Sequence, residues 1–284
     1  MTDMTILPGH FETGIAGRTR GRIGAGQISR RNFFGVLALI FIASATVTVL
    51  RCNSMAAMGS MSMQGGWTMS MAWMRMPGET WAGAAASFVA MWVVMMVAMM
   101  LPSLTPSLWR SYQSVKETCN ASRNRFVMLV GAGYFFVWTL FGLALFPLGA
   151  AIAAVQMEWP ALAHAAPVAV GWIVLAAGTF QFTSWKARHL DCCRESGNEC
   201  SGRVRTGAGW IQGLRLGFHC GLSCANLTAI LLVAGVMDLR AMAAITVAIT
   251  AERLAPAGHG VSRAIGVVAV GAGMMLIAGV VRHG

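Results

Sequence analysis

The sequence predicts an all-α membrane protein, a polytopic bundle of about seven transmembrane helices, with six as the alternative. Only 11% of the 284 residues are charged and 56% are hydrophobic, whereas an ordinary soluble domain is about 25% charged. Uncharged runs recur along the chain, and a helix needs about 20 apolar residues to cross the hydrocarbon core. The runs lack the polar–apolar alternation of outer-membrane barrels, which favours helices over strands.

Six of the expected spans are clear uncharged runs. They cover residues 33–50, 81–101, 126–155, 161–185, 216–237 and 264–281. The second is expected to end at Leu101-Pro102-Ser103, and Pro147 interrupts the third. A seventh run, 241–251, is short and either tilts or stays partly buried, so the number of crossings depends on it.

The basic residues predict the orientation, because Lys and Arg gather on the cytoplasmic side of membrane helices. With a cytoplasmic N-terminus, all but four of the 21 Lys and Arg residues fall on that side. The exceptions are Arg51, Arg75, Arg240 and Arg282. The net charge of +11 is therefore a signal of topology, and no nucleic-acid partner is expected.

The chain divides into a flexible basic cytoplasmic tail, 1–31, and a transmembrane helical domain, 32–284. Within that domain we expect a Met-rich external loop, 51–80, and a Cys-rich cytoplasmic loop, 186–215. The lipid bilayer is the first predicted partner. Glu252 and Asp238 lie near membrane ends, and local ion pairs with Arg253 and Arg240 are the simpler account of both.

Methionines gather in the external loop and continue into the second helix. Thioether sulfur is soft and uncharged, and it selects copper(I) or silver(I) over zinc or magnesium. The alternative is an interfacial segment that lies on lipid headgroups, or adaptable packing in the helix. The candidate ligands are Met61, Met63, Met69 and Met71 in the loop, and Met91, Met95 and Met99, which share one helix face.

Six of the seven cysteines are expected at the cytoplasmic side, where thiols act as metal ligands or redox groups. Cys220 and Cys224, four residues apart at the start of the fifth span, share one helix face and suit a two-coordinate metal. His219, on an adjacent face, is a candidate third ligand. The alternative is a pair of small core residues.

The loop after the fourth span also concentrates metal-binding side chains. It contains His189, Cys192, Cys193 and Cys200 together with three carboxylates. It lacks the paired C-x-x-C pattern of a zinc ribbon, so a zinc or copper site, a solvated loop with incidental cysteines and a redox role all remain open.

Several motifs resemble those of a bacterial family of predicted metal-binding integral membrane proteins of unknown function. Met91-Trp92 followed by 98–103, AMMLPS, resembles the family signature. The segment 178–186, GTFQFTSWK, followed by Cys192, is similar to a later motif, and the Cys220 and Cys224 helix, the 235–238 turn and Glu252-Arg253 follow in order. The resemblance covers residues 84–280 and implies a multi-pass protein of the bacterial inner (plasma) membrane.

The sequence departs from the family pattern at Ser223, where the family often has a second cysteine beside its neighbour. Asp238 replaces the usual Asn, and Phe180 replaces Tyr. The change at Ser223 reduces the number of thiolates and weakens any multi-thiolate site.

We therefore expect a metal-binding membrane protein that handles copper(I), by capture or by transfer across or at the membrane, with silver or zinc as alternative ions. No nucleotide loop, nucleophile elbow or H-E-x-x-H pattern is present, so no enzyme is predicted. The rivals are a chaperone that loads a membrane or periplasmic metalloprotein without transport, a membrane thiol redox protein, and a structural subunit without metal.

Overall fold

The computed structural model describes residues 13–57, 61–62, 68–69, 78, 80–114, 120–195, 206–236, 238–255 and 258–283. The chain forms two compact units, Met1–Ala43 and Ser44–Gly284, and each is described by itself. Helix α1 (Thr13–Ala57) belongs to both. Residues 13–31, expected to be a flexible tail, are thus helical in the structure. That stretch contains no proline, and extending an existing helix avoids the cost of a new nucleus.

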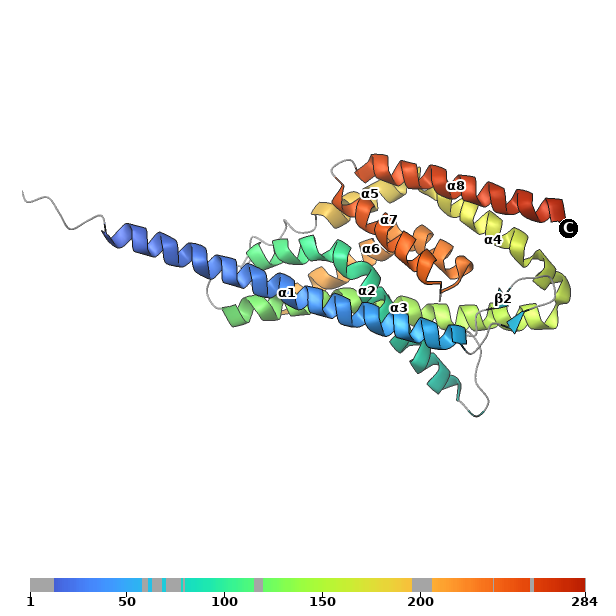
Figure 1. The fold of residues 1–284 in the computed structure, drawn as a ribbon, viewed down its shortest axis with the longest axis horizontal. Coiled ribbons are helices and arrows are strands. Elements are labelled where there is room, and N and C mark those ends of the chain that lie inside the picture. Colours follow the sequence, from blue (N-terminus) through green and yellow to red (C-terminus); the bar gives the residue numbers. More distant parts are fainter. Residues whose placement is uncertain are drawn as a thin grey trace, which may run out of the picture. The chain divides into compact units, whose positions relative to one another are not determined.

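The second unit contains the remaining elements of the described chain (Figure 1). They are β1 (Met61–Ser62), β2 (Thr68–Met69), α2 (Trp81–Ser114), α3 (Asn120–Glu158), α4 (Pro160–Phe180), α5 (Ser184–Glu195), α6 (Thr206–Ala234), α7 (Leu239–Leu254) and α8 (Gly258–His283). The expected Met-rich loop is therefore partly structured. Its first residues complete α1, and β1 pairs antiparallel with β2 so that Met61 lies opposite Met69.

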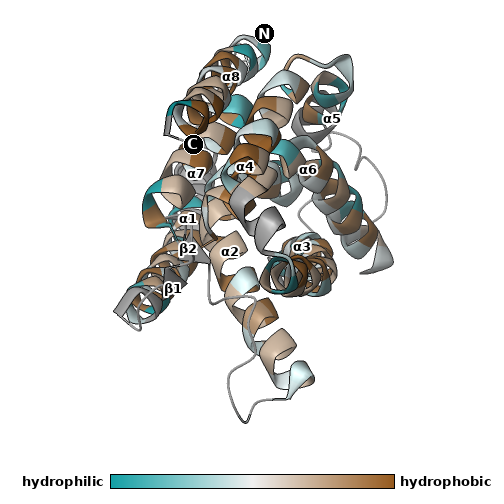
Figure 2. Ribbon diagram, turned by 90° about the vertical axis from the view of Figure 1, so that its right-hand side faces the viewer, coloured by the Kyte–Doolittle hydropathy of each residue, from teal (hydrophilic) through white to brown (hydrophobic). Residues whose placement is uncertain are grey.

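The all-helical, multi-span fold class predicted from the sequence is confirmed. Within the described residues, five helices are long and apolar enough to cross a membrane, and a bent pair, α4 with α5, makes up to six. The hydropathy colouring shows mainly hydrophobic residues on α3 and α8 and more hydrophilic residues on α5 (Figure 2). Helix α7 has 16 residues, about 24 Å at 1.5 Å per residue, so the segment that looked short in the sequence is also short in the structure.

Helix α2 does not end at Leu101-Pro102-Ser103 as expected. It continues through Pro102 and Pro106 to Ser114, a length of 34 residues. Proline removes a backbone donor from a helix, and neighbouring hydroxyl groups and helices can satisfy the carbonyls that are left. The carbonyls that lose their helical donor at the two prolines are those of Ala98 and Pro102. Between them, the hydroxyl of Ser103 donates to the carbonyl of Met100 at 2.9 Å, and that of Thr105 donates to the carbonyl of Leu101 at 2.8 Å.

The expected fourth span, 161–185, is not continuous either. Helix α4 ends at Phe180, and after a turn α5 starts at Ser184, with a bend of 67° between them. The turn is closed by backbone bonds from residues 181, 182 and 183 to the carbonyls three residues earlier. The bend places Gln181 at the junction of the two helices, from where its side chain reaches α7 and α8.

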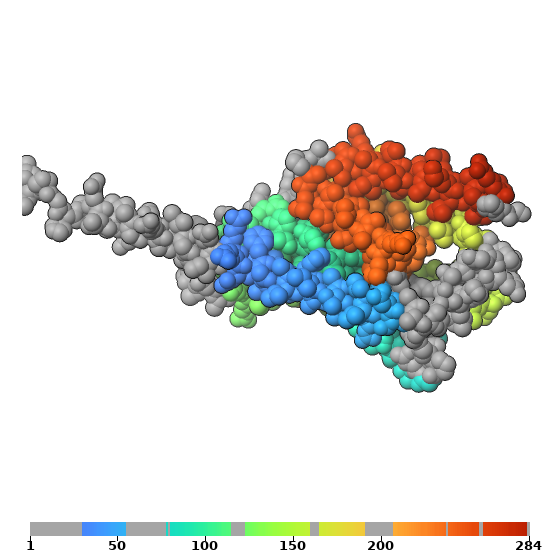
Figure 3. Space-filling view, in the orientation of Figure 1, coloured from blue at the N-terminus to red at the C-terminus, as the bar shows by residue number. Residues whose placement is uncertain are grey.

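The helices of the second unit pack mainly as neighbouring pairs, α4 with α8 and α3 with α6. Helices α4 and α8 run side by side in Figure 1, and α7 and α8 share one surface in Figure 3. The α3–α6 pair is close because α6 presents glycines to α3, the small-residue packing common between membrane helices. A Cβ atom on Gly217 would lie 2.9 Å from the carbonyl oxygen of Tyr134, so only glycine allows this separation.

Candidate metal centre

Cys220 and Cys224 form the buried thiol pair at the centre of the candidate site. Both side chains lie on α6, one turn apart, and their exposed fractions are 0% and 2%. Neither is in a disulfide, and the thiol of Cys224 interacts with that of Cys220. The predicted pairing on one helix face agrees with this geometry. The predicted helix start does not, because α6 begins at Thr206, fourteen residues before Cys220.

Tyr134 on α3 covers one side of the thiol pair. Its hydroxyl group lies 2.8 Å from the sulfur of Cys220, within hydrogen-bond distance, and its side chain is fully buried. The close packing of α6 against α3 at Gly217, one turn before the thiol pair, brings this hydroxyl group to the sulfur. Tyr134 is therefore a direct neighbour of the candidate ligand Cys220.

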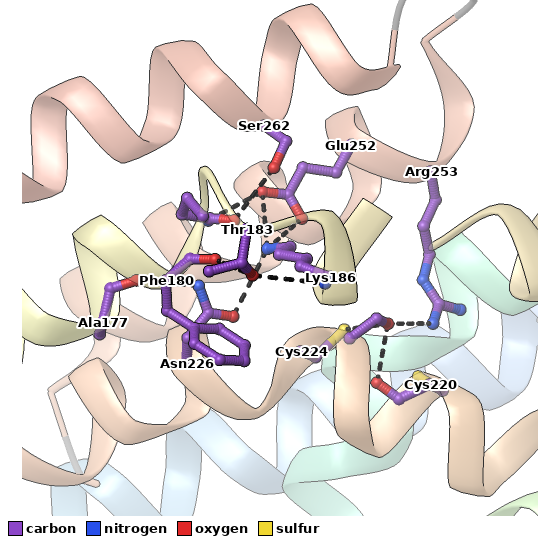
Figure 4. Close-up of polar contacts among 12 residues, drawn as sticks. Ala177, Phe180, Thr183, Lys186, Cys220, Cys224, Asn226, Glu252, Arg253 and Ser262 are labelled. Atoms are coloured by element: carbon purple, nitrogen blue, oxygen red, sulfur yellow. Dashed lines mark hydrogen bonds and ion pairs between the residues drawn. The ribbon is translucent and has the colours of Figure 1, made fainter. Parts of the chain in front are cut away.

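Ser223 and Arg253 bound the pair on the α7 side (Figure 4). The hydroxyl of Ser223 donates to the carbonyl of Cys220 at 3.0 Å and lies 3.7 Å from the sulfur of Cys224. The guanidinium of Arg253 donates to the same hydroxyl at 3.5 Å. The residue that stands in place of a further cysteine thus connects the thiol pair to a cation.

A buried ion pair lies on the other side of Cys224. The ammonium group of Lys186 on α5 is 3.0 Å from the carboxylate of Glu252 on α7, and the two side chains are 1% and 2% exposed. Charges are rarely placed inside a membrane protein without a partner or a function. Lys186 and Arg253 both act electrostatically on Cys224, so each favours negative charge on that sulfur.

Three further polar side chains complete the network around the ion pair (Figure 4). Gln181 donates to Glu252 at 2.9 Å and accepts from the hydroxyl of Ser262 on α8 at 3.0 Å. Lys186 donates to the amide oxygen of Asn226 at 3.4 Å, and Asn226 donates to the carbonyl of Ala177 at 3.1 Å. The network therefore joins α4, α5, α6, α7 and α8 beside the thiol pair.

Both local ion pairs expected near the membrane ends are wrong. Glu252 bonds to Lys186, 66 residues away, rather than to its neighbour Arg253. Asp238 is the N-cap of α7, and its carboxylate accepts from the backbone amides of Arg240 and Ala241 at 2.8 and 3.3 Å. The first carboxylate belongs to the site, and the second has a structural role because it satisfies free amides of the helix end.

His219, the candidate third ligand of the thiol pair, contacts His189 in the structure. Its Nδ1 atom lies 3.0 Å from Nδ1 of His189 on α5.

The expected Cys-rich loop 186–215 is largely helical, since α5 extends to Glu195 and α6 starts at Thr206. Buried Lys186 and Leu190, one turn apart, fix α5 to the bundle, which explains why a hydrophilic segment is helical here.

The structure describes only some of the other predicted sulfur ligands. Cys192 and Cys193 lie in the last turn of α5, three and four positions after His189, while Cys200, Met63 and Met71 lie outside the described residues. On α2, Met95 and Met99 are buried and Met91 is half-buried. The helix face predicted for the three methionines is therefore buried in the protein at Met95 and Met99 and partly exposed at Met91.

The described residues contain no group of three or more His, Cys, Asp and Glu side chains that could hold a metal ion. Zinc in proteins almost always takes four ligands in structural sites and three in catalytic sites. A pair of thiols suits copper(I) or silver(I), which are soft ions that accept two sulfur ligands. The donor set of the site therefore fits a monovalent soft ion better than zinc.

Sequence reasoning missed Tyr134, Asn226 and Ser262 and gave no role to Lys186. A usable signal was present for Lys186 and Asn226, because a charge or an amide at the end of or within an apolar span calls for a buried partner. Tyr134 carried no such signal, since tyrosine is common in membrane helices. Gln181 and Lys186 were singled out only by the family resemblance, whereas Glu252 was also noted as a charge near a membrane end, and the structure brings all three together.

The fold and the site define a polytopic helical protein with a buried pair of thiols beside a buried ion pair. The chain belongs to the PpoB2 copper chaperone family, whose model matches residues 89–276. The match includes α3 to α7, and with them the thiol pair and the ion pair. No curated protein and no solved structure matches the chain.

Proposed function

We propose that this protein is a membrane-embedded copper(I) chaperone, which holds the ion between Cys220 and Cys224 and passes it to a protein that needs copper. The observation that carries the proposal is the pair of buried thiols one turn apart on α6. Copper(I) is the cargo, and silver(I) is an alternative ion of the same chemistry. Membership of a copper chaperone family supports the choice of copper.

The electrostatics of the site support an anionic copper complex. Two thiols lose their protons when they bind one copper(I) ion, so the bound form carries a net charge of −1. Lys186 and Arg253 both act on Cys224, and the hydroxyl of Tyr134 can donate to the Cys220 thiolate. These groups stabilise negative charge in a buried position where it is otherwise expensive.

The protein is proposed to lie in a bacterial inner membrane with its N-terminus in the cytoplasm. In that orientation the Met-rich segment 51–80 collects copper(I) outside, and Met91, Met95 and Met99 form part of a route to the thiols. Thioethers suit this task because they bind soft ions without losing a proton. Ligand exchange between sulfur atoms requires no energy-coupling motif.

Between the two roles considered, transport and loading of a partner, the family description supports loading. The two roles differ in proteoliposomes. A chaperone binds copper(I) that is added outside but does not accumulate it in the lumen, whereas a transporter fills the lumen. Accumulation in excess of the protein present would contradict the chaperone role and leave the copper site intact.

The site itself is tested by anaerobic copper(I) competition against a chelator, with the full-length protein in detergent. We expect Cys220→Ser and Cys224→Ser each to release the ion that the wild type holds, because one thiolate cannot complete a two-coordinate site. Cys52→Ser is the matched control, since Cys52 is also buried and free of disulfides but lies on α1. Equal copper affinity in the control and in both α6 variants would overturn the proposal.

A further inference from the structure

Two imidazole rings meet between α5 and α6, outside the buried thiol pair. The Nδ1 atoms of His189 and His219 are 3.0 Å apart, so one donates a hydrogen bond and the other accepts it. Both side chains are half-buried. The ring of Trp185, 4.2 Å away between centroids, packs against His189. The two nitrogen atoms are thus held toward one another by separate helices.

The distance between these nitrogen atoms is close to that of two ligands on one metal ion. Metal–imidazole bonds of about 2.0 Å place the two nitrogens roughly 3.3 to 4.0 Å apart, for angles from tetrahedral to linear. A ring rotation that separates the atoms by less than about 1 Å is therefore enough. The donating ring exchanges its Nδ1 proton for one on Nε2, and no net proton is released.

We propose that His189 and His219 form a second, nitrogen-donor site for a monovalent soft ion, from which the ion leaves the protein. The identity of the ion rests on the proposed function. His219 directly precedes Cys220 in α6, so the two residues lie on adjacent helix faces. Cys220 is fully buried and His219 is half-exposed. The donors therefore lead from a closed thiolate site to one that a partner can reach.

The chemistry of the pair suits release rather than storage. Neutral imidazole is a harder and weaker ligand for copper(I) than thiolate. Two imidazole ligands leave room on the ion for a ligand from the receiving protein, and the described residues add no third His, Cys, Asp or Glu to the pair. The positive charge of the Arg188 guanidinium interacts electrostatically with His189. At this position it repels a divalent ion more strongly than a monovalent one.

The inference is tested with silver(I), a non-redox analogue of copper(I), and with full-length protein labelled with ¹⁵N in histidine. The ¹⁵N shifts of the ring nitrogens report on histidine coordination even if other sulfur atoms bind silver, and His→Ala variants assign the signals of His189 and His219 among the six histidines of the chain. We expect silver(I) to shift Nδ1 of both His189 and His219. Either His189→Ala or His219→Ala should abolish the shift of the remaining partner, because two ligands share one ion.

The exposed His259 on α8 provides the matched control, and His259→Ala should leave both shifts intact. In Cys220→Ser/Cys224→Ser protein the two histidines should still respond to silver(I). An unchanged pair in wild-type protein that fills its thiol site would overturn this inference and leave the proposed function standing. Histidine shifts in wild-type protein whose Cys220 and Cys224 bind no silver would contradict the proposed function and leave this inference standing.

Discussion

The ammonium group of Lys186 lies 3.0 Å from the carboxylate of Glu252, and 66 residues of chain separate them. The pair is buried beside the thiol of Cys224 and is held by Gln181 and Asn226. An ion pair in this position connects the ends of α5 and α7 to the site. Because the same ion pair joins two helices and lies beside Cys224, a change that breaks it is expected to alter both the packing of the helices and the environment of the thiol pair.

Removing one partner of this ion pair should destabilise the fold strongly. We expect Lys186→Met or Glu252→Gln alone to cost about 3–5 kcal/mol, because each leaves a buried charge without its counter-ion. The double variant should cost less than the sum of the two. Reversible unfolding in detergent measures all three, with exposed Arg263→Met as a control for the loss of a cation. Additive losses would show that the two charges do not stabilise one another.

Tyr134→Phe should weaken copper(I) binding without unfolding the protein. The change removes the hydroxyl group that lies 2.8 Å from the Cys220 sulfur and keeps the buried ring. Groups that hydrogen-bond to a metal ligand typically change affinity by 10- to 100-fold, and we expect roughly tenfold here. Anaerobic chelator competition gives the value. Tyr112→Phe, at the other tyrosine of the chain, should bind copper as the wild type does, and an equal loss there would remove the assigned role.

Gly217→Ala should disturb the site from a distance. The added methyl group would meet the backbone of Tyr134 at 2.9 Å, and a backbone atom cannot move aside as a flexible side chain can. We expect α3 and α6 to separate, with a lower unfolding temperature and weaker copper binding. Gly207→Ala on the same helix has nothing within 4 Å of the new atom and should be neutral or slightly stabilising, because alanine favours helix. Equal behaviour of the two variants would contradict the close packing.

Met95→Leu/Met99→Leu should slow the arrival of copper but not its final binding. Leucine conserves volume at a cost usually below about 1.5 kcal/mol, and the double variant removes two of the three thioethers of the proposed route and leaves Met91. The measurement is the rate at which reconstituted protein takes copper(I) from a chelator added outside. Met274→Leu/Met275→Leu on the exposed face of α8 is the control. Equal rates for the two double variants would mean that Met95 and Met99 serve only packing.

The sequence by itself determined the membrane class and the thiol pair. Long uncharged runs leave only helices or closed barrels as structures that satisfy the backbone in lipid, and the runs lack the pattern of a barrel. The four-residue spacing of Cys220 and Cys224 fixes their common face in any helix, because the period of the helix is local. The short length of the span near 241–251 was also visible, since the length of an uncharged run is read directly from the sequence.

Only the tertiary structure decided which distant residues surround the thiols. The break after Phe180, the passage of α2 through Pro102 and the helical state of α5 all depend on contacts with other helices. The same holds for Tyr134 at Cys220, Lys186 at Glu252 and His189 at His219. These contacts join residues that are 30 to 86 positions apart. Hydropathy and helical periodicity act over a few turns, so they cannot specify pairings that arise only when helices pack.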